Sequence, residues 1–177
     1  MRLITLLTDF GAQDAYVGAV KGAILSINPQ ASIVDLCHEV PPQDILAGAF
    51  LLGAAYAYFP GGAVHVAVVD PGVGTRRRAV LLATPSAFFL APDNGLLTFV
   101  LRGIQRRAQR PAARPFGAPY RVRVPPGCAA FALAEPRYWR RPVSSTFHGR
   151  DIFAPVAAHL SLGTPAEAFG PRVSTLV

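Results

Sequence analysis

The stretch Val68-Val-Asp-Pro-Gly-Val-Gly-Thr-Arg-Arg-Arg78 decides the fold of this chain, because a buried strand ends inside it. The apolar run 63–69 stops at Asp70, a Pro-Gly-Val-Gly turn follows, and three arginines come next. Open α/β sheets gather the groups that handle ligands at the carboxyl ends of their strands. Asp70 and Arg77 are therefore either a structural ion pair or part of a reactive site.

The residues before this stretch alternate between strand and helix patterns. Short apolar runs at 3–7 and 33–36 predict strands, and apolar residues at helical spacing predict helices over 14–27 and 45–59. Asp14 is the expected N-cap of the first helix. Together with the strand at 63–69 this is a β-α-β-α-β order, which predicts an α/β fold of three layers, with a mostly parallel sheet and helices on both faces.

The second half of the chain is less regular. Strands are predicted at 79–83, 87–90 and 129–133, a turn at 92–95, and helices over 96–101 and 152–162. Residues 102–127 are rich in Arg and Pro and read as a long exposed excursion within a domain of residues 1–170. Residues 171–177 read as the start of a linker.

Composition limits the class of protein. The chain has 177 residues, 51% of them hydrophobic and 15% charged, which suits one domain with a core covered on both faces. Its longest apolar run, 45–59, is too short for a membrane-spanning helix, and no signal-peptide pattern precedes the first strand, so we expect a cytoplasmic protein. Cys37 and Cys128 have neither disulfide-framework nor zinc spacing.

Positive charge is concentrated in one segment. Residues 102–141 hold ten arginines and one acid, a charge of +9, whereas the rest of the chain sums to −2. Tyr120, Tyr138 and Trp139 could stack on bases there. No recognised nucleic-acid motif accompanies them, so a solvated basic surface is the alternative, and we do not expect nucleic acid as the partner.

Several polar residues at strand ends are candidates for chemistry. In a parallel sheet Asp9 and Asp70 can face one crevice, where paired carboxylates could hold ribose hydroxyls; the alternative is turn or helix capping. His148 lies just before a helix, whose N-terminus lowers the basicity of an imidazole. His38 and His159 are expected to be structural. Nothing requires a metal site, and we expect none.

Six blocks of the sequence, in order, carry a resemblance to a known family. They are Thr8-Asp-Phe-Gly11, Tyr16-Val-Gly-Ala-Val-Lys-Gly22, His38-Glu-Val-Pro-Pro-Gln-Asp44, Val69-Asp-Pro-Gly-Val-Gly-Thr75, Pro92-Asp-Asn-Gly-Leu-Leu97 and Ser145-Thr-Phe-His-Gly-Arg-Asp-Ile-Phe-Ala-Pro155. The chain resembles the S-adenosylmethionine (SAM) hydroxide adenosyltransferases, relatives of the fluorinase and chlorinase. The match spans nearly the whole chain apart from 102–143.

The resemblance implies that SAM and water are converted to adenosine and methionine in a pocket between the subunits of a homotrimer. SAM is then the substrate, and no cofactor is expected. The resemblance implies a water-handling set and a group of substrate-binding residues. The first set is Asp70, Arg77 and His148; the second is Asp9 for the ribose, Asp14 and Tyr16 for the methionine end, Gln43, Thr146 and Phe147 near the sugar or reaction centre, and Asn94.

These roles make chemical sense. Methionine leaves SAM as a neutral thioether, so the site must supply an aligned, hydroxide-like nucleophile rather than an acid. Arg77 could stabilise the developing hydroxide, Asp70 could orient the guanidinium, and neutral His148 could accept the proton. Which of the three takes the proton stays open at this point.

Two departures from the family pattern matter. The fluorinase-like branch carries tyrosines at the positions of Asp70 and His148, so the resemblance favours water over halide here. Family members continue into a small C-terminal β-barrel domain that helps hold the substrate, and we expect that domain to be absent from this chain. The alternative is therefore that the chain forms a truncated, non-catalytic trimer that binds SAM or adenosine. A SAM halogenase and a nucleic-acid-binding protein are less favoured alternatives.

Overall fold

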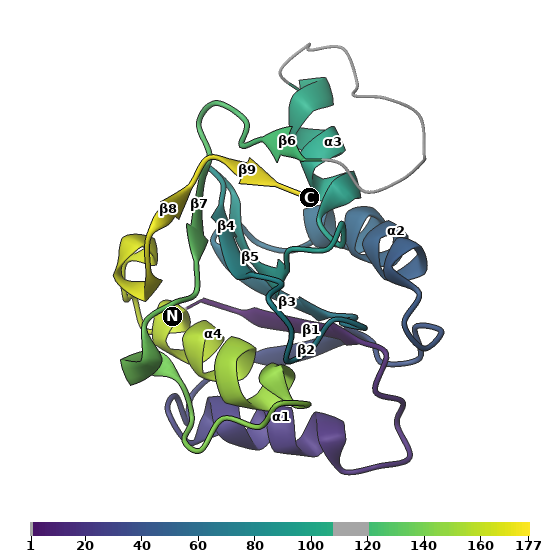
Figure 1. The fold of residues 1–177 in the computed structure, drawn as a ribbon, viewed down its shortest axis with the longest axis vertical. Helices are drawn as coiled ribbons and strands as arrows, with labels where there is room; N and C mark the ends of the chain where they lie inside the picture. Colours follow the sequence, from purple (N-terminus) through teal and green to yellow (C-terminus); the bar gives the residue numbers. More distant parts are fainter. Residues whose placement is uncertain (1, 108–120) are drawn as a thin grey trace.

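The computed structural model describes residues 2–107 and 121–177. Its centre is a seven-stranded sheet in the order β2-β1-β3-β5-β4-β7-β8, beside a small sheet of β6 and β9 (Figure 1). The strands are β1 Ile4–Thr8, β2 Ile33–Cys37, β3 Ala63–Val68, β4 Ala79–Ala83, β5 Ala87–Pro92, β6 Val122–Arg123, β7 Ala129–Ala132, β8 Arg172–Val173 and β9 Thr175–Leu176. The helices are α1 Tyr16–Leu25, α2 Ile45–Ala55, α3 Thr98–Arg107 and α4 Ala154–Ser161, with short helical turns η1 Tyr56–Tyr58, η2 Pro136–Tyr138, η3 Gly149–Phe153 and η4 Ala166–Phe169.

The predicted α/β architecture is confirmed. Strands β2, β1, β3 and β5 run parallel, and β5, β4, β7 and β8 continue the sheet antiparallel. Helices α1 and α4 lie together on one face and α2 and α3 on the other (Figure 1). Each face of the sheet has its own apolar core. Val66 and Val68 of β3 belong to one core, and Ala67 and Val69 belong to the other. The alternation follows from the period of two along a strand.

The two N-terminal helices begin differently. Asp44 caps α2 as a side-chain acceptor, taking a hydrogen bond of 2.9 Å from the backbone N–H of Ala47. The expected cap of α1 is wrong: the helix begins at Tyr16 after Ala15, without a side-chain cap, and Asp14 lies exposed in the preceding loop. Asp14 is thus one position too early to cap the first turn, which leaves its carboxylate available to solvent.

Two segments are more ordered than their composition suggested. Helix α3 extends to Arg107, so the first residues of the expected excursion 102–127 are helical; residues 108–120, including Tyr120, lie outside the described residues. The expected linker 171–177 forms strands β8 and β9, which pair with β7 and β6. Apolar period alone misses both, because Arg-rich and two-residue elements gain their order from tertiary contacts.

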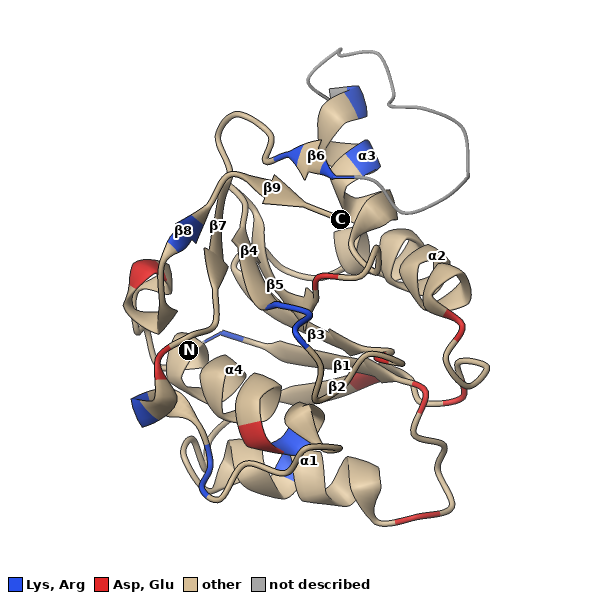
Figure 2. Ribbon diagram, viewed as in Figure 1, with Lys and Arg blue, Asp and Glu red and all other residues tan. Residues whose placement is uncertain are grey.

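Charges are distributed unevenly over this frame. Acidic residues lie in the loops after β1 and before α1 and α2, while basic residues lie on α3, β6 and β8 and in the loop before β4 (Figure 2). In the described part of the chain the arginines are thus spread over several elements instead of forming one stripe. No helix there is long and apolar enough to cross a membrane.

His65 in β3 makes the fold sensitive to acid. It is fully buried, its Nδ1 lies 2.8 Å from the Thr5 hydroxyl, and its ring stacks on Phe89 at 5.0 Å. Burial lowers the pKa of His65 to about 4. The His65 ring is therefore protonated below about pH 6.5 in the unfolded chain but only below about pH 4 in the folded chain. The contribution of neutral His65 to the free energy of unfolding is therefore fully present above pH 6.5 and is lost as the pH falls towards 4.

We expect urea unfolding of the protein to show a drop of about 3 kcal/mol between pH 7 and pH 4 from this residue. His65→Gln, which has no titrating ring, should flatten this dependence, although it lowers stability at pH 7 by disturbing the core. Unfolding curves of both proteins across this pH range provide the measurement. An equal pH dependence in the variant would contradict the assignment to His65.

Candidate active site

The candidate site lies between β1 and β3. The connection after β1 leads to β2 on one side of it, and the connection after β2 leads back to β3 on the other side. Strand β1 pairs with β2 on one side and β3 on the other, and Thr8 is paired with Val68 at their carboxyl ends. Asp9 directly follows the end of β1, and Asp70 lies two residues after the end of β3. Helices α1 and α2 lie on opposite faces of the sheet, and open α/β sheets bind their ligands at such a point, outside the carboxyl ends of the strands.

Asp70, Arg77 and His148 form one connected group. Arg77 Nε donates to both carboxylate oxygens of Asp70, at 3.0 and 2.8 Å, and its Nη2 donates to Asp70 Oδ2 and lies 2.9 Å from His148 Nδ1. The side chains of Asp70 and Arg77 are only 5% and 10% exposed. A guanidinium in this fixed, two-sided contact keeps one orientation.

The turn between Asp70 and Arg77 explains how they meet. The N–H of Val73 donates to the carbonyl of Asp70 at 3.1 Å, and the Thr75 hydroxyl donates to the carbonyl of Gly72 at 2.7 Å. Gly74 has φ +76°, a left-handed conformation that glycine adopts at little cost. The chain therefore reverses and brings residue 77 back over residue 70, as the Pro-Gly-Val-Gly sequence suggested.

His148 is held in its neutral form. Burial lowers its pKa, and the charge of Arg77 lowers it further, against the smaller opposing effect of Asp70. A guanidinium has only donors, so His148 Nδ1 must accept and the neutral ring carries its proton on Nε2. To take a proton from water at Nδ1, His148 would first have to give up its contact with Arg77.

Asp9 and three aromatic rings lie beside this group. Asp9 Oδ2 accepts a 2.8 Å hydrogen bond from the backbone N–H of Gln43, whose φ of +64° is left-handed for a residue with a side chain. The rings of Phe10, Tyr16 and Phe147 meet pairwise at centroid distances between 5.3 and 6.3 Å. Tyr16 remains 52% exposed, so the aromatic cluster presents a surface to solvent.

The other predicted binding residues lie in different settings. Asn94 is occupied by the backbone: its Nδ2 donates to the carbonyl of Val69 at 2.9 Å, and its Oδ1 accepts from the N–H of Leu96 at 3.2 Å. It braces the strand end just before Asp70. Thr146 is exposed, with its hydroxyl 3.2 Å from that of Ser144.

His38, which was expected to be structural, supports the site. His38 holds the loop after β1 from two sides, because its Nδ1 lies 2.8 Å from the Thr8 hydroxyl and its carbonyl accepts from the N–H of Gly11 at 2.8 Å. That loop carries Asp9. The signal was the order His38-Glu39 at a strand end, but a lone histidine does not reveal which loop it will meet.

Asp151 is a further support of the site, and sequence reasoning missed it. It is fully buried and accepts hydrogen bonds from Arg150 and from the N–H of Ser144 at 2.8 Å. Burial alone would raise the pKa of Asp151, but these donors hold it below its usual value. Arg150 in turn lies 4.8 Å above the ring of Phe147. Asp151 thus closes the 144–151 loop that presents His148.

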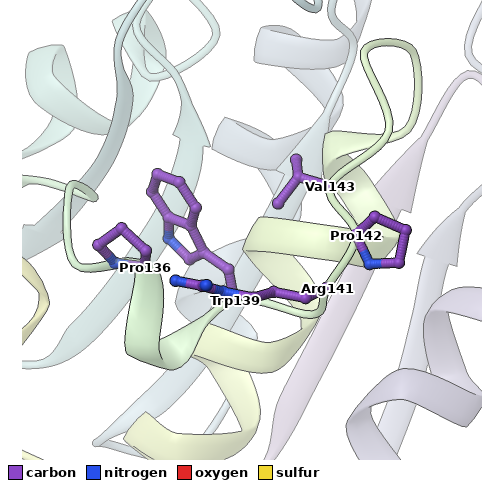
Figure 3. A pocket seen from close by; sticks show the side chains of 5 residues that line it. All are labelled: Pro136, Trp139, Arg141, Pro142 and Val143. Atoms are coloured by element: carbon purple, nitrogen blue, oxygen red, sulfur yellow. The ribbon is translucent and has the colours of Figure 1, made fainter.

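Other hollows and clusters add little to the site. A pocket lined by Pro136, Trp139, Arg141, Pro142 and Val143 lies next to the 144–148 loop but contains none of the predicted site residues (Figure 3). Within residues 2–107 and 121–177, no group of three or more His, Cys, Asp or Glu side chains is placed to hold a metal ion.

Comparisons with known proteins identify relatives over nearly the full chain. Residues 4–170 match the model of the SAM hydroxide adenosyltransferase N-terminal domain. An (R)-S-adenosyl-L-methionine hydrolase of Thermus thermophilus is 45% identical over 98% of this chain and 62% of its own length. A fluorinase of Nocardia brasiliensis is 27% identical over 97% of this chain and 58% of its own.

A crystal structure of an uncharacterized conserved protein from Thermotoga maritima has the same fold. It superposes with a TM-score of 0.81 at 35% identity, over 98% of this chain and 60% of its own. The chain therefore spans about three fifths of the length of the relatives it matches.

Proposed function

Because the chain belongs to the SAM hydroxide adenosyltransferase family, we propose that it is the catalytic α/β domain of a hydrolase that converts SAM and water to adenosine and methionine. The observation that carries the proposal is the connected group of Asp70, Arg77 and His148 at the sheet edge. The name of the Thermus thermophilus relative supports the same reaction.

The proposed reaction is a displacement at C5′ of the ribose. One O–C5′ bond forms as the C5′–S⁺ bond breaks, methionine leaves as a neutral thioether, and one proton goes to the site or to solvent. Arg77 would stabilise the hydroxide character that develops on the water. Asp70 fixes the guanidinium, and neutral His148 completes its second side. The low exposure of Asp70 and Arg77 would reduce the screening of their charges by solvent.

The same proposal assigns the substrate contacts. Asp9 would hold the ribose hydroxyls, and Phe147 would lie against the sugar beside Gln43 and Thr146. Asp14 in the loop before α1 and Tyr16 at its first position are exposed, and they would meet the methionine end. Asn94 would also contact the substrate, because its one bond from Nδ2 and one to Oδ1 leave a second donor and a second acceptor position on the amide.

Water is the proposed nucleophile instead of halide. The group of Asp70, Arg77 and His148 offers polar side chains that can bond a water molecule, which supports this choice. The identity to the hydrolase, 45%, also exceeds that to the fluorinase, 27%.

We further propose that a neighbouring subunit completes the site, within a homotrimer. Helix α2 contains no polar side chain, yet Leu46 and Phe50 on its outer face are 55% and 60% exposed. A helix that is apolar all round is usually buried. These residues and Phe99 line a shallow groove that begins at Asp44, next to Gln43. Cys37 and Cys128 are free, which suits the reducing cytoplasm as the proposed location.

The test is incubation of the protein with SAM, followed by chromatography for adenosine and methionine. Equal amounts of the two products are expected, and oxygen from ¹⁸O-labelled water should appear at the 5′ position of adenosine. A halide-dependent product would point to the halogenase alternative. Binding of SAM by calorimetry without any product would leave only the ligand-binding alternative.

The activity should depend on the protonation of His148. When Nδ1 is protonated, two cations face each other across the Arg77–His148 contact, so the group loses its arrangement. Since burial and Arg77 both lower the pKa of His148, we expect kcat to be constant above pH 6.5 and to fall only at a lower pH. A profile of kcat against pH checks this. A loss of activity centred above pH 6.5 would contradict it.

A further inference from the structure

Arg78 and Asp93 form an ion pair that the proposed reaction does not use directly. Arg78 Nε donates to Asp93 Oδ2 at 2.9 Å, and its Nη2 donates to the same oxygen. The Asp93 side chain is only 3% exposed, while that of Arg78 is 30% exposed. The backbone N–H of Asp93 also donates to the carbonyl of Arg78 at 2.9 Å, so the two residues are joined by side chain and backbone.

The same pair holds the last strand. Arg78 Nη2 donates to the carbonyl of Thr175 at 2.8 Å, and Asp93 Oδ1 accepts from the N–H of Val177 at 2.8 Å. Strand β9 is also attached by a two-residue pairing with β6 and by the buried side chain of Leu176. A displacement of β9 would therefore break or shift its hydrogen bonds to Arg78 and Asp93.

Both ends of the 70–77 turn are attached to this pair. Arg78 directly follows Arg77, and Asp93 directly precedes Asn94, whose amide holds the carbonyl of Val69 just before Asp70. The hairpin of β4 and β5 does not depend on the ion pair, because five residue pairs and a buried core already join the strands. What the ion pair adds is the position of the residues beyond the strand ends.

We propose that Arg78 and Asp93 are positioning residues for the reaction, clamping the 70–77 turn between strand β9 and the loop after β5. This inference rests on the proposed function, since the clamp acts through Arg77 and Asp70. Rigid support matters here because a shift of about 1 Å in a reacting group can cost about 100-fold in rate.

The test compares variants of the pair with a neighbour of the same type. Arg78→Met removes the charge and every donor, Arg78→Lys keeps the charge without the paired geometry, and Asp93→Asn keeps an acceptor for Val177. Arg76→Met is the control, because Arg76 lies exposed in the same turn. For each full chain we would measure kcat, KM for SAM, the thermal midpoint and the NMR titration of the His148 ring.

Arg78→Met and Asp93→Asn should lower kcat by about 10- to 100-fold with KM changed less than about threefold, and Arg78→Lys should fall in between. The His148 titration should move up towards 6.5 as Arg77 moves away, whereas Arg76→Met should match the wild type in all four measurements. A lower thermal midpoint with unchanged kcat and unchanged His148 titration would overturn the proposal. If the wild type forms no adenosine, the proposed function fails, and the His148 titration still decides on the clamp.

Discussion

Replacing Arg77 by alanine should lower kcat for SAM hydrolysis by about 100-fold or more and change KM little. Arg77 is the only member of the Asp70–Arg77–His148 group that contacts both others, and its fixed charge would act on the developing hydroxide. Losing one preorganised electrostatic donor typically costs about 10²–10³ in rate. Initial rates of adenosine release over a range of SAM concentrations separate kcat from KM.

The comparison with two further variants sharpens this prediction. Asp70→Asn should also reduce kcat strongly, because an amide offers one oxygen where the carboxylate accepts Nε and Nη2. Arg76→Ala, one residue away and exposed, should leave both constants near the wild-type values. Equal losses in kcat/KM and in SAM affinity for Arg77→Ala would instead indicate a structural ion pair.

Gly74→Ala should have an effect of similar size, through separation of two loops. A Cβ at residue 74 would lie 2.4 Å from the carbonyl oxygen of Ser145, in the loop that carries His148. Something must shift by several tenths of an ångström or more, which would pull His148 away from Arg77. We expect a loss in kcat of about 100-fold, together with about 1–3 kcal/mol of stability from the left-handed backbone.

A second glycine separates these two costs. Gly62, at the start of β3, has φ +84° and no atom within 4 Å of an added Cβ. Gly62→Ala should therefore show the backbone cost in a urea unfolding curve but keep the wild-type kcat. If Gly74→Ala lost stability alone, like this control, then contact between the two loops would not matter for the reaction.

The sequence predicted the part of the fold that depends on local pattern. The alternation of apolar runs with helical spacing was enough for the parallel half of the sheet, and an aspartate after each of two strands was enough to place Asp9 and Asp70 at one edge. The resemblance selected Arg77 among three consecutive arginines. The structure separates them physically: Arg77 meets Asp70, Arg78 meets Asp93, and Arg76 is exposed.

Features that rest on distant contacts were not predictable in this way. The position of His38 against Thr8 and the buried partners of Asp151 depend on how loops meet after folding. The motif suggested ligand binding by Asn94, and it did not show that the same amide bonds two backbone groups beside Asp70. The strands β8 and β9 are two residues each, too short for any periodicity to show, and their order comes from β7, β6 and Asp93.

The contacts between Asp93 and Val177 also set an order of events during synthesis. Strands β1, β2 and β3 have all their sequence available once the first 70 residues have emerged, so the parallel half of the sheet can begin to form early. Helix α4 and strands β8 and β9 are translated about 80 to 100 residues later. The turn that bears Arg77 therefore lacks the support of strand β9 until that strand has been synthesised, and pairing across such distances is slow.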